Sequence, residues 1–153
     1  MMVRSWAEDY DTIIVTSEKY HGQTFLVRRF HQRNEIAFTD NYFTLYMVDD
    51  AERYGKELAE KAGLEADVSV AFTEGERPKA LEADADFSDY VKMGGSPFCY
   101  ITVIMNESTQ KEEQLAFVGF LAEQRFQCNV VFRYQSSSWR YGVNSDYEIQ
   151  DYN

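Results

Sequence analysis

The chain has 153 residues, of which 44% are hydrophobic and 16% aromatic, and its 26 acidic against 15 basic residues give a net charge of −11. This length and composition are typical of one globular domain and exclude disorder over most of the chain. The charge opposes binding to nucleic acid or to an anionic membrane, and it favours basic partners.

The sequence carries no sign of a membrane-spanning or secreted protein. No apolar run approaches the roughly 18 residues that a membrane helix needs. The N-terminal stretch MMVRSWAEDYD lacks the apolar core of a signal peptide, so we expect a cytoplasmic protein. Cys99 and Cys128 lie in separate apolar runs without a C-x-x-C motif, which predicts two buried thiols in a reducing compartment. A disulfide would require these runs to be neighbouring strands with facing side chains.

The first third of the chain predicts strands. Residues 12–16, 24–31 and 35–39 are rich in β-branched and aromatic side chains, and residues 32–34 form a short polar turn that predicts a hairpin. Residues 42–48 (YFTLYMV) are aromatic and apolar, and we expect a buried strand there.

The middle of the chain predicts two helices with a strand between them. The capping-box pattern D-x-x-E at residues 49–52 predicts a helix over 49–62, in which Glu57 and Lys61 are spaced for an i,i+4 ion pair. Residues 68–73 predict a strand. A second helix is predicted over residues 78–93, because proline suits its first position and two glycines follow its end.

The last third of the chain predicts strands around one helix. Residues 97–105 are the most hydrophobic run and predict a central strand. A second capping box, T-x-x-E at residues 109–112, predicts the start of a helix. Residues 126–134 predict a strand, and the polar residues 135–153 predict an edge strand at 139–143 and a mobile tail.

This order of elements predicts the α+β class. Early hairpins favour antiparallel pairing, and the later strand–helix–strand units permit parallel pairing with right-handed crossovers. We expect a single domain over residues 1–153, with a mixed, mostly antiparallel sheet and about three helices packed mainly on one face.

Motifs of known reactions and of metal sites are missing. The sequence has no G-x-S-x-G elbow, no phosphate-binding loop and no dinucleotide-binding fingerprint, so an enzyme is not the favoured interpretation. A calcium loop that begins at Asp84 would need glycine where Asp89 stands and glutamate where Gly95 stands. A loop from Glu82 fails in the same way, and zinc-type Cys/His clusters are lacking. We expect neither a metal nor a cofactor.

The acidic residues are concentrated in the middle of the chain. Residues 41–96 carry thirteen acids and six bases, against six and five in residues 1–40 and seven and four in residues 97–153. In the predicted helix over 78–93, Glu82, Asp86 and Asp89 lie within about 60° of one another and lack basic partners in the favourable i,i+4 order until Lys92. Such a ridge of carboxylates is either ordinary solvated surface or a contact for a basic partner.

Tyrosines beside carboxylates favour the second interpretation, because exposed tyrosine supplies rigid contact area and acids steer basic surfaces. We therefore expect a small acidic inhibitor or adaptor that engages a basic, nucleic-acid-binding protein, with no direct contact to nucleic acid. In size, charge and aromatic content the chain is similar to DNA-mimicking anti-restriction and anti-CRISPR proteins and to toxin-immunity proteins. The predicted partner-binding residues are Glu74, Glu76, Glu82, Asp84, Asp86, Asp89, Tyr147, Glu148, Asp151 and Tyr152.

Two alternatives stay open. The first is a small enzyme or phospho-ligand binder, in which histidine acts as acid or base beside arginine donors. Its candidate residues are His21, Arg28, Arg29, His31 and Arg33. The same pattern is also expected of a solvated strand face whose charges are balanced by acids across the sheet. The second alternative is a homo-oligomeric structural subunit whose aromatic strands pair at an edge.

Overall fold

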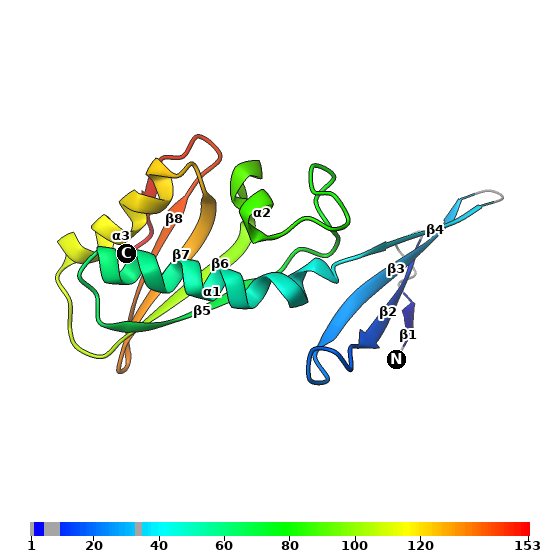
Figure 1. The fold of residues 1–153 in the computed structure, drawn as a ribbon, viewed down its shortest axis with the longest axis horizontal. Coiled ribbons are helices and arrows are strands. Elements are labelled where there is room, and N and C mark those ends of the chain that lie inside the picture. Colours follow the sequence, from blue (N-terminus) through cyan, green and yellow to red (C-terminus); the bar gives the residue numbers. More distant parts are fainter. Residues whose placement is uncertain (1, 5–9, 33–34) are drawn as a thin grey trace. The chain divides into compact units, whose positions relative to one another are not determined.

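A computed structural model describes residues 2–4, 10–32 and 35–153, and it confirms the α+β class (Figure 1). The chain divides into two compact units. The first unit comprises Met1–Met47 with Glu74–Ala83, and the second unit comprises Val48–Thr73 with Asp84–Asn153. The strands form two sheets, whereas the sequence predicts one, and the single-domain organisation stays a prediction.

The first unit contains a four-stranded antiparallel sheet in the order β1-β2-β3-β4. Its strands are β1 (Met2–Arg4), β2 (Tyr10–Thr16), β3 (Thr24–Gln32) and β4 (Glu35–Asp40). The predicted pairing of β3 with β4 is confirmed. His21 and Gly22, with φ angles of 52° and 79°, turn the chain between β2 and β3.

The residues predicted as a strand over 42–48 begin a helix instead. Helix α1 (Phe43–Lys61) starts where the carbonyl of Asn41 accepts hydrogen bonds from the backbone and hydroxyl of Thr44. Phe43, Met47 and Ala51 are buried at i, i+4 and i+8, which is helical spacing. A short apolar run does not distinguish a buried strand from a buried helix, and here the helical spacing decides.

The second unit contains a five-stranded sheet in the order β5-β6-β7-β8-β9. Its neighbours are antiparallel except β6 and β7, which are parallel and joined through helix α3 (Lys111–Glu123). The sheet is thus mixed and mostly antiparallel, as the sequence predicts. Its strands are β5 (Ala66–Phe72), β6 (Gly95–Met105), β7 (Gln127–Tyr134), β8 (Ser137–Val143) and β9 (Ile149–Asp151).

Helices cover one face of this five-stranded sheet (Figure 1). A side chain at Gly55 of α1 would clash with Val68 of β5, because its Cβ would lie 2.7 Å from the Val68 side chain. In α3, the ring of Phe117 lies 5.6 Å from that of Phe132 of β7. Both sheet residues point to the same side, so the prediction of helices on one face is confirmed for this unit.

The two cysteines lie on this helix-covered face. Cys99 of β6 and Cys128 of β7 are buried on neighbouring strands, which confirms their predicted burial. Burial raises the pKa of the Cys128 thiol, so it stays protonated at neutral pH. Among the described residues, no helix combines the length and the apolarity needed to cross a membrane.

Candidate functional site

Helix α2 (Phe87–Met93) is much shorter than the helix predicted over residues 78–93. It begins at a capping box: the backbone N–H of Asp89 donates to the Asp86 carboxylate at 3.0 Å, and that of Asp86 donates to Asp89 at 3.2 Å. Residues 79–85 form turns and irregular backbone, because no i,i+4 ion pair supports a helix there and the capping box of Asp86 with Asp89 fixes the start at Phe87. The acidic ridge predicted on one long helix is therefore absent from the described chain.

The predicted partner-binding acids are divided between the two units. Glu74, Glu76 and Glu82 belong to the first unit, and Asp84, Asp86 and Asp89 belong to the second. Glu74 is buried, and its carbonyl accepts a hydrogen bond from the side chain of Asn41 at 2.9 Å. Glu82, Asp84, Asp86 and Asp89 remain exposed or half-buried, so they are accessible to a partner.

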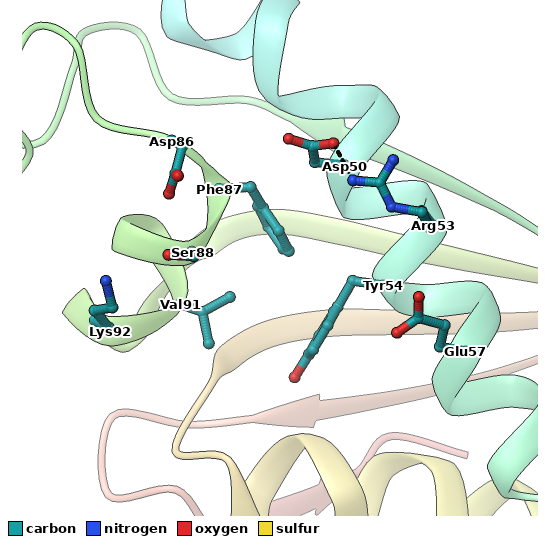
Figure 2. Close-up of a pocket in the computed structure, with 9 residues that line it drawn as sticks. All are labelled: Asp50, Arg53, Tyr54, Glu57, Asp86, Phe87, Ser88, Val91 and Lys92. Atoms are coloured by element: carbon teal, nitrogen blue, oxygen red, sulfur yellow. Dashed lines mark hydrogen bonds and ion pairs between the residues drawn. The ribbon is translucent and has the colours of Figure 1, made fainter.

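A cleft of about 540 Å³ lies in the second unit between α1 and α2 (Figure 2). One wall comes from α1 and the other from α2 and its cap. The lining residues are Asp50, Arg53, Tyr54, Glu57, Asp86, Phe87, Ser88, Val91 and Lys92. Of the acids predicted from the sequence, only Asp86 lines this cleft.

Aromatic rings form the floor of the cleft. The rings of Tyr54 and Phe87 lie 5.5 Å apart at 62°, and Phe126 packs against both at about 6 Å. Burial, with a smaller effect of Cys128, raises the pKa of Tyr54 to about 12, so the phenol is neutral at physiological pH. Its hydroxyl is buried and has no hydrogen-bond partner among the described residues.

Carboxylates outnumber bases on the rim of the cleft. Arg53 pairs with Asp50 at 2.5 Å on α1. Lys92 pairs with Asp89 at 3.0 Å, which lowers the pKa of Asp89 and raises that of Lys92. Within the described chain, Glu57 forms no ion pair. Both rim bases are thus engaged on their own helices, while Glu57 belongs to the α1 wall of the cleft and Asp86 to the opposite wall (Figure 2).

Sequence reasoning missed the contribution of α1 to this site. The predicted ion pair of Glu57 with Lys61 is not formed, since the Lys61 ammonium lies 4.1 Å from the ring centre of Phe120. Asp50, Tyr54 and Glu57 are spaced at i, i+4 and i+7, which places them on one helix face. That spacing is the sequence pattern from which the α1 side of the cleft could have been predicted.

The C-terminal residues predicted as a second contact do not share one surface. Asp151 binds Lys111 of α3 at 2.7 Å, on the helix-covered side of the sheet. Tyr152 lies over Gly142, where an added Cβ would be 3.0 Å from its hydroxyl. The hydroxyl of Tyr147 approaches Gly94 at the end of α2. Glu148 is exposed in the loop between β8 and β9. Each of these four residues remains a separate candidate for partner binding, but they do not form one contact surface.

The arginine–histidine cluster proposed for a phospho-ligand is also divided. Arg29 and His31 of β3 share Asp11 of β2, at 2.5 and 3.1 Å. Arg28 lies on the opposite face of the strand, over the ring of Tyr10 at 5.1 Å. His21 is exposed in the turn before β3, and Arg33 lies outside the described residues.

Asp11 explains how the first unit uses this cluster. The Asp11 side chain is buried. A hydrogen bond from Arg29, with a smaller contribution from His31, lowers its pKa. This is the balance of strand charges by an acid across the sheet that the sequence offers as the simpler explanation. The two basic side chains that lie together therefore serve an internal ion pair.

Within the described residues, no group of three or more His, Cys, Asp or Glu side chains is placed to hold a metal ion. Comparisons of the chain with protein-family models, with curated proteins and with solved structures gave no match.

Proposed function

We propose that the chain is a small acidic protein-binding module, an inhibitor or adaptor that engages a basic, nucleic-acid-binding protein. The observation that supports this proposal is the cleft between α1 and α2, in which an aromatic floor lies beneath a rim of carboxylates. A lysine or arginine side chain of the partner is the chemical group that matches both features.

The aromatic floor suits a cationic side chain. A guanidinium or ammonium group over an aromatic face gains about 0.5–2 kcal/mol, with the larger values at desolvated sites. Tyr54 and Phe87 supply such faces, and Val91 adds apolar surface for the aliphatic part of the side chain. Glu57 and Asp86 then supply charge-assisted hydrogen bonds from the two walls.

The charge of the second unit supports the same proposal. This unit carries 17 acidic and 8 basic residues, whereas the first unit carries 9 and 7. A negative field of this kind accelerates encounter with a basic surface and repels nucleic acid itself. The acidic unit would thus compete with nucleic acid for the basic surface of its partner.

Affinity capture from the native host, with a cleft variant, tests this function. Glu57→Gln with Asp86→Asn removes two charges from the rim, and asparagine preserves the start of α2 because it caps helices as well as aspartate does. The wild-type chain should recover a basic nucleic-acid-binding protein, and the cleft variant should lose it. Salt above about 0.3 M should also release this partner, since exposed charges are then screened within several ångströms.

The matched control is Glu60→Gln with Glu112→Gln, which removes the same charge from exposed positions outside the cleft. This control should retain the partner. Retention by the cleft variant would contradict the proposal, and equal loss from both double variants would show that net charge acts without the cleft.

A further inference from the structure

The side of the five-stranded sheet opposite the helices presents a different chemistry from the cleft. Along β6, Ile101 and Val103 point to the helices and are buried, whereas Tyr100, Thr102 and Ile104 point to the other side. Tyr100 and Ile104 are 39% and 45% exposed. We call this side, formed by the outward residues of β6, β7 and β8, the open face.

Strand register places a compact set of polar and aromatic groups on the open face. Tyr100 lies opposite Asn129, which lies opposite Gly142. Because Gly142 has no side chain, the ring of Tyr152 lies over it. The two tyrosines therefore lie on either side of Asn129.

Two arginines lie next to these tyrosines. Arg140 of β8 is opposite Val131 of β7, and Arg133 is two residues after Val131 on β7. The two arginines are therefore diagonal neighbours on adjacent strands, with Cα atoms about 7–8 Å apart. Neither forms an ion pair with another described residue. Asp67 of β5 is the acidic residue that points to this side from the described strands. It lies opposite Ile104, which lies opposite Arg133, so two strand spacings, or about 10 Å, separate Asp67 from Arg133.

These groups line one hollow of about 520 Å³. Its outward side chains are Tyr100, Asn129, Arg133, Ser138, Arg140 and Tyr152, with Val131 as the apolar part. Two unpaired arginines on one face are an unexpected feature in a chain with 26 acidic and 15 basic residues. Their positive charge complements an anion.

We propose that the open face binds a small anion that carries a planar ring, the chemistry of a mononucleotide. The ring would stack on Tyr152, and the phosphate would accept hydrogen bonds from Arg133 and Arg140. The Asn129 amide nitrogen donates to the carbonyl of Pro97 at 2.7 Å, which leaves its side-chain oxygen to accept an N–H of the ring.

Charge favours a mononucleotide over a nucleic-acid strand at this site. At physiological ionic strength charges are screened within about 8 Å, so the two arginines dominate the field that a small ligand experiences. A long polyanion would extend over the acidic remainder of a chain with net charge −11 and would be repelled.

Titration of the full chain with AMP, followed by calorimetry and by amide chemical shifts, tests this site. We expect saturable binding with the largest shifts at Asn129, Val131 and Arg140. Arg133→Gln or Arg140→Gln should each weaken binding by about tenfold or more, and Tyr152→Ala by about fivefold or more. Arg77→Gln, which removes an exposed arginine outside both the open face and the cleft, is the matched control and should leave AMP binding unchanged.

Several results would overturn the proposal. Equal binding of inorganic phosphate would show that the ring contributes nothing, and tighter binding of a short oligodeoxythymidine would assign the face to nucleic-acid strands. Absence of AMP binding would leave the face without a nucleotide role. A dimer in sedimentation that Arg133→Gln dissociates would assign the face to a second copy of the chain.

Discussion

The two units differ in how their sheets obtain a core. In the second unit, one face of the sheet is covered by helices, and Val103, Leu121 and Phe132 are completely buried. In the first unit, the described apolar side chains of β2, β3 and β4 are half-buried or exposed, and Phe38 is 61% exposed. The buried side chain of β2 is a carboxylate, that of Asp11.

This difference shows that similar strand sequences acquire stability by different means. A sheet that packs against helices gains the full transfer free energy of its apolar face, roughly 1.5–3 kcal/mol for each large side chain. A sheet whose apolar residues stay partly exposed to solvent gains less transfer free energy. Exposed apolar side chains of this kind mark surfaces for association. Ile36 and Phe38 of the edge strand β4 fit the homo-oligomer alternative in this respect.

Paired truncations of phenylalanine should give the largest contrast between the units. Phe132→Ala removes a fully buried ring and should lower the free energy of unfolding by about 3–5 kcal/mol. Phe38→Ala removes an exposed ring from the other sheet and should change it by less than about 1 kcal/mol. Urea denaturation followed by circular dichroism measures both, and similar losses would refute the contrast.

A smaller effect is expected from the ion pair that joins α3 to the edge of the five-stranded sheet. A hydrogen bond from Lys111, with smaller contributions from Asn153, lowers the pKa of Asp151 to about 2. Because the folded-state pKa lies below the unfolded value, the stabilisation is present above about pH 4 and is lost as the pH falls toward about 2. Asp151→Asn should therefore lower Tm near neutral pH, and the difference from wild type should shrink in acid.

Thermal denaturation between about pH 6 and pH 2 measures this difference. Asp67→Asn, which removes the same charge from an exposed carboxylate without an ion pair in the described chain, should have a smaller effect near neutral pH. A constant difference between Asp151→Asn and wild type over the whole range would show that the ion pair does not stabilise the fold.

Most strands and the α+β class could be predicted from the sequence, because strong periodicity and β-branched composition identify half-buried and central strands. The region around residues 42–48 could not, since an apolar run of this length suits either a buried strand or the first turns of a helix. The segment before Phe87 could not either, because Ala80, Ala83 and Phe87 have the spacing of one helix face and only the Asp86 cap fixes the true start.

The candidate cleft was harder to predict than the fold. Asp86 was identified from its charge, but Tyr54 and Glu57 lie about thirty residues earlier in the chain and join it only through tertiary packing. The open face was missed because Arg133 and Arg140 are isolated bases in the sequence. Strand register makes them neighbours.

The most direct test of the proposed function is an amide chemical-shift titration of the full chain with an arginine-rich peptide. The proposal predicts that the largest shifts occur at Tyr54, Glu57, Phe87 and Val91, and that Glu57→Gln with Asp86→Asn weakens binding more than Glu60→Gln with Glu112→Gln does. Shifts spread evenly over the acidic surface, or equal weakening by the two double variants, would contradict it.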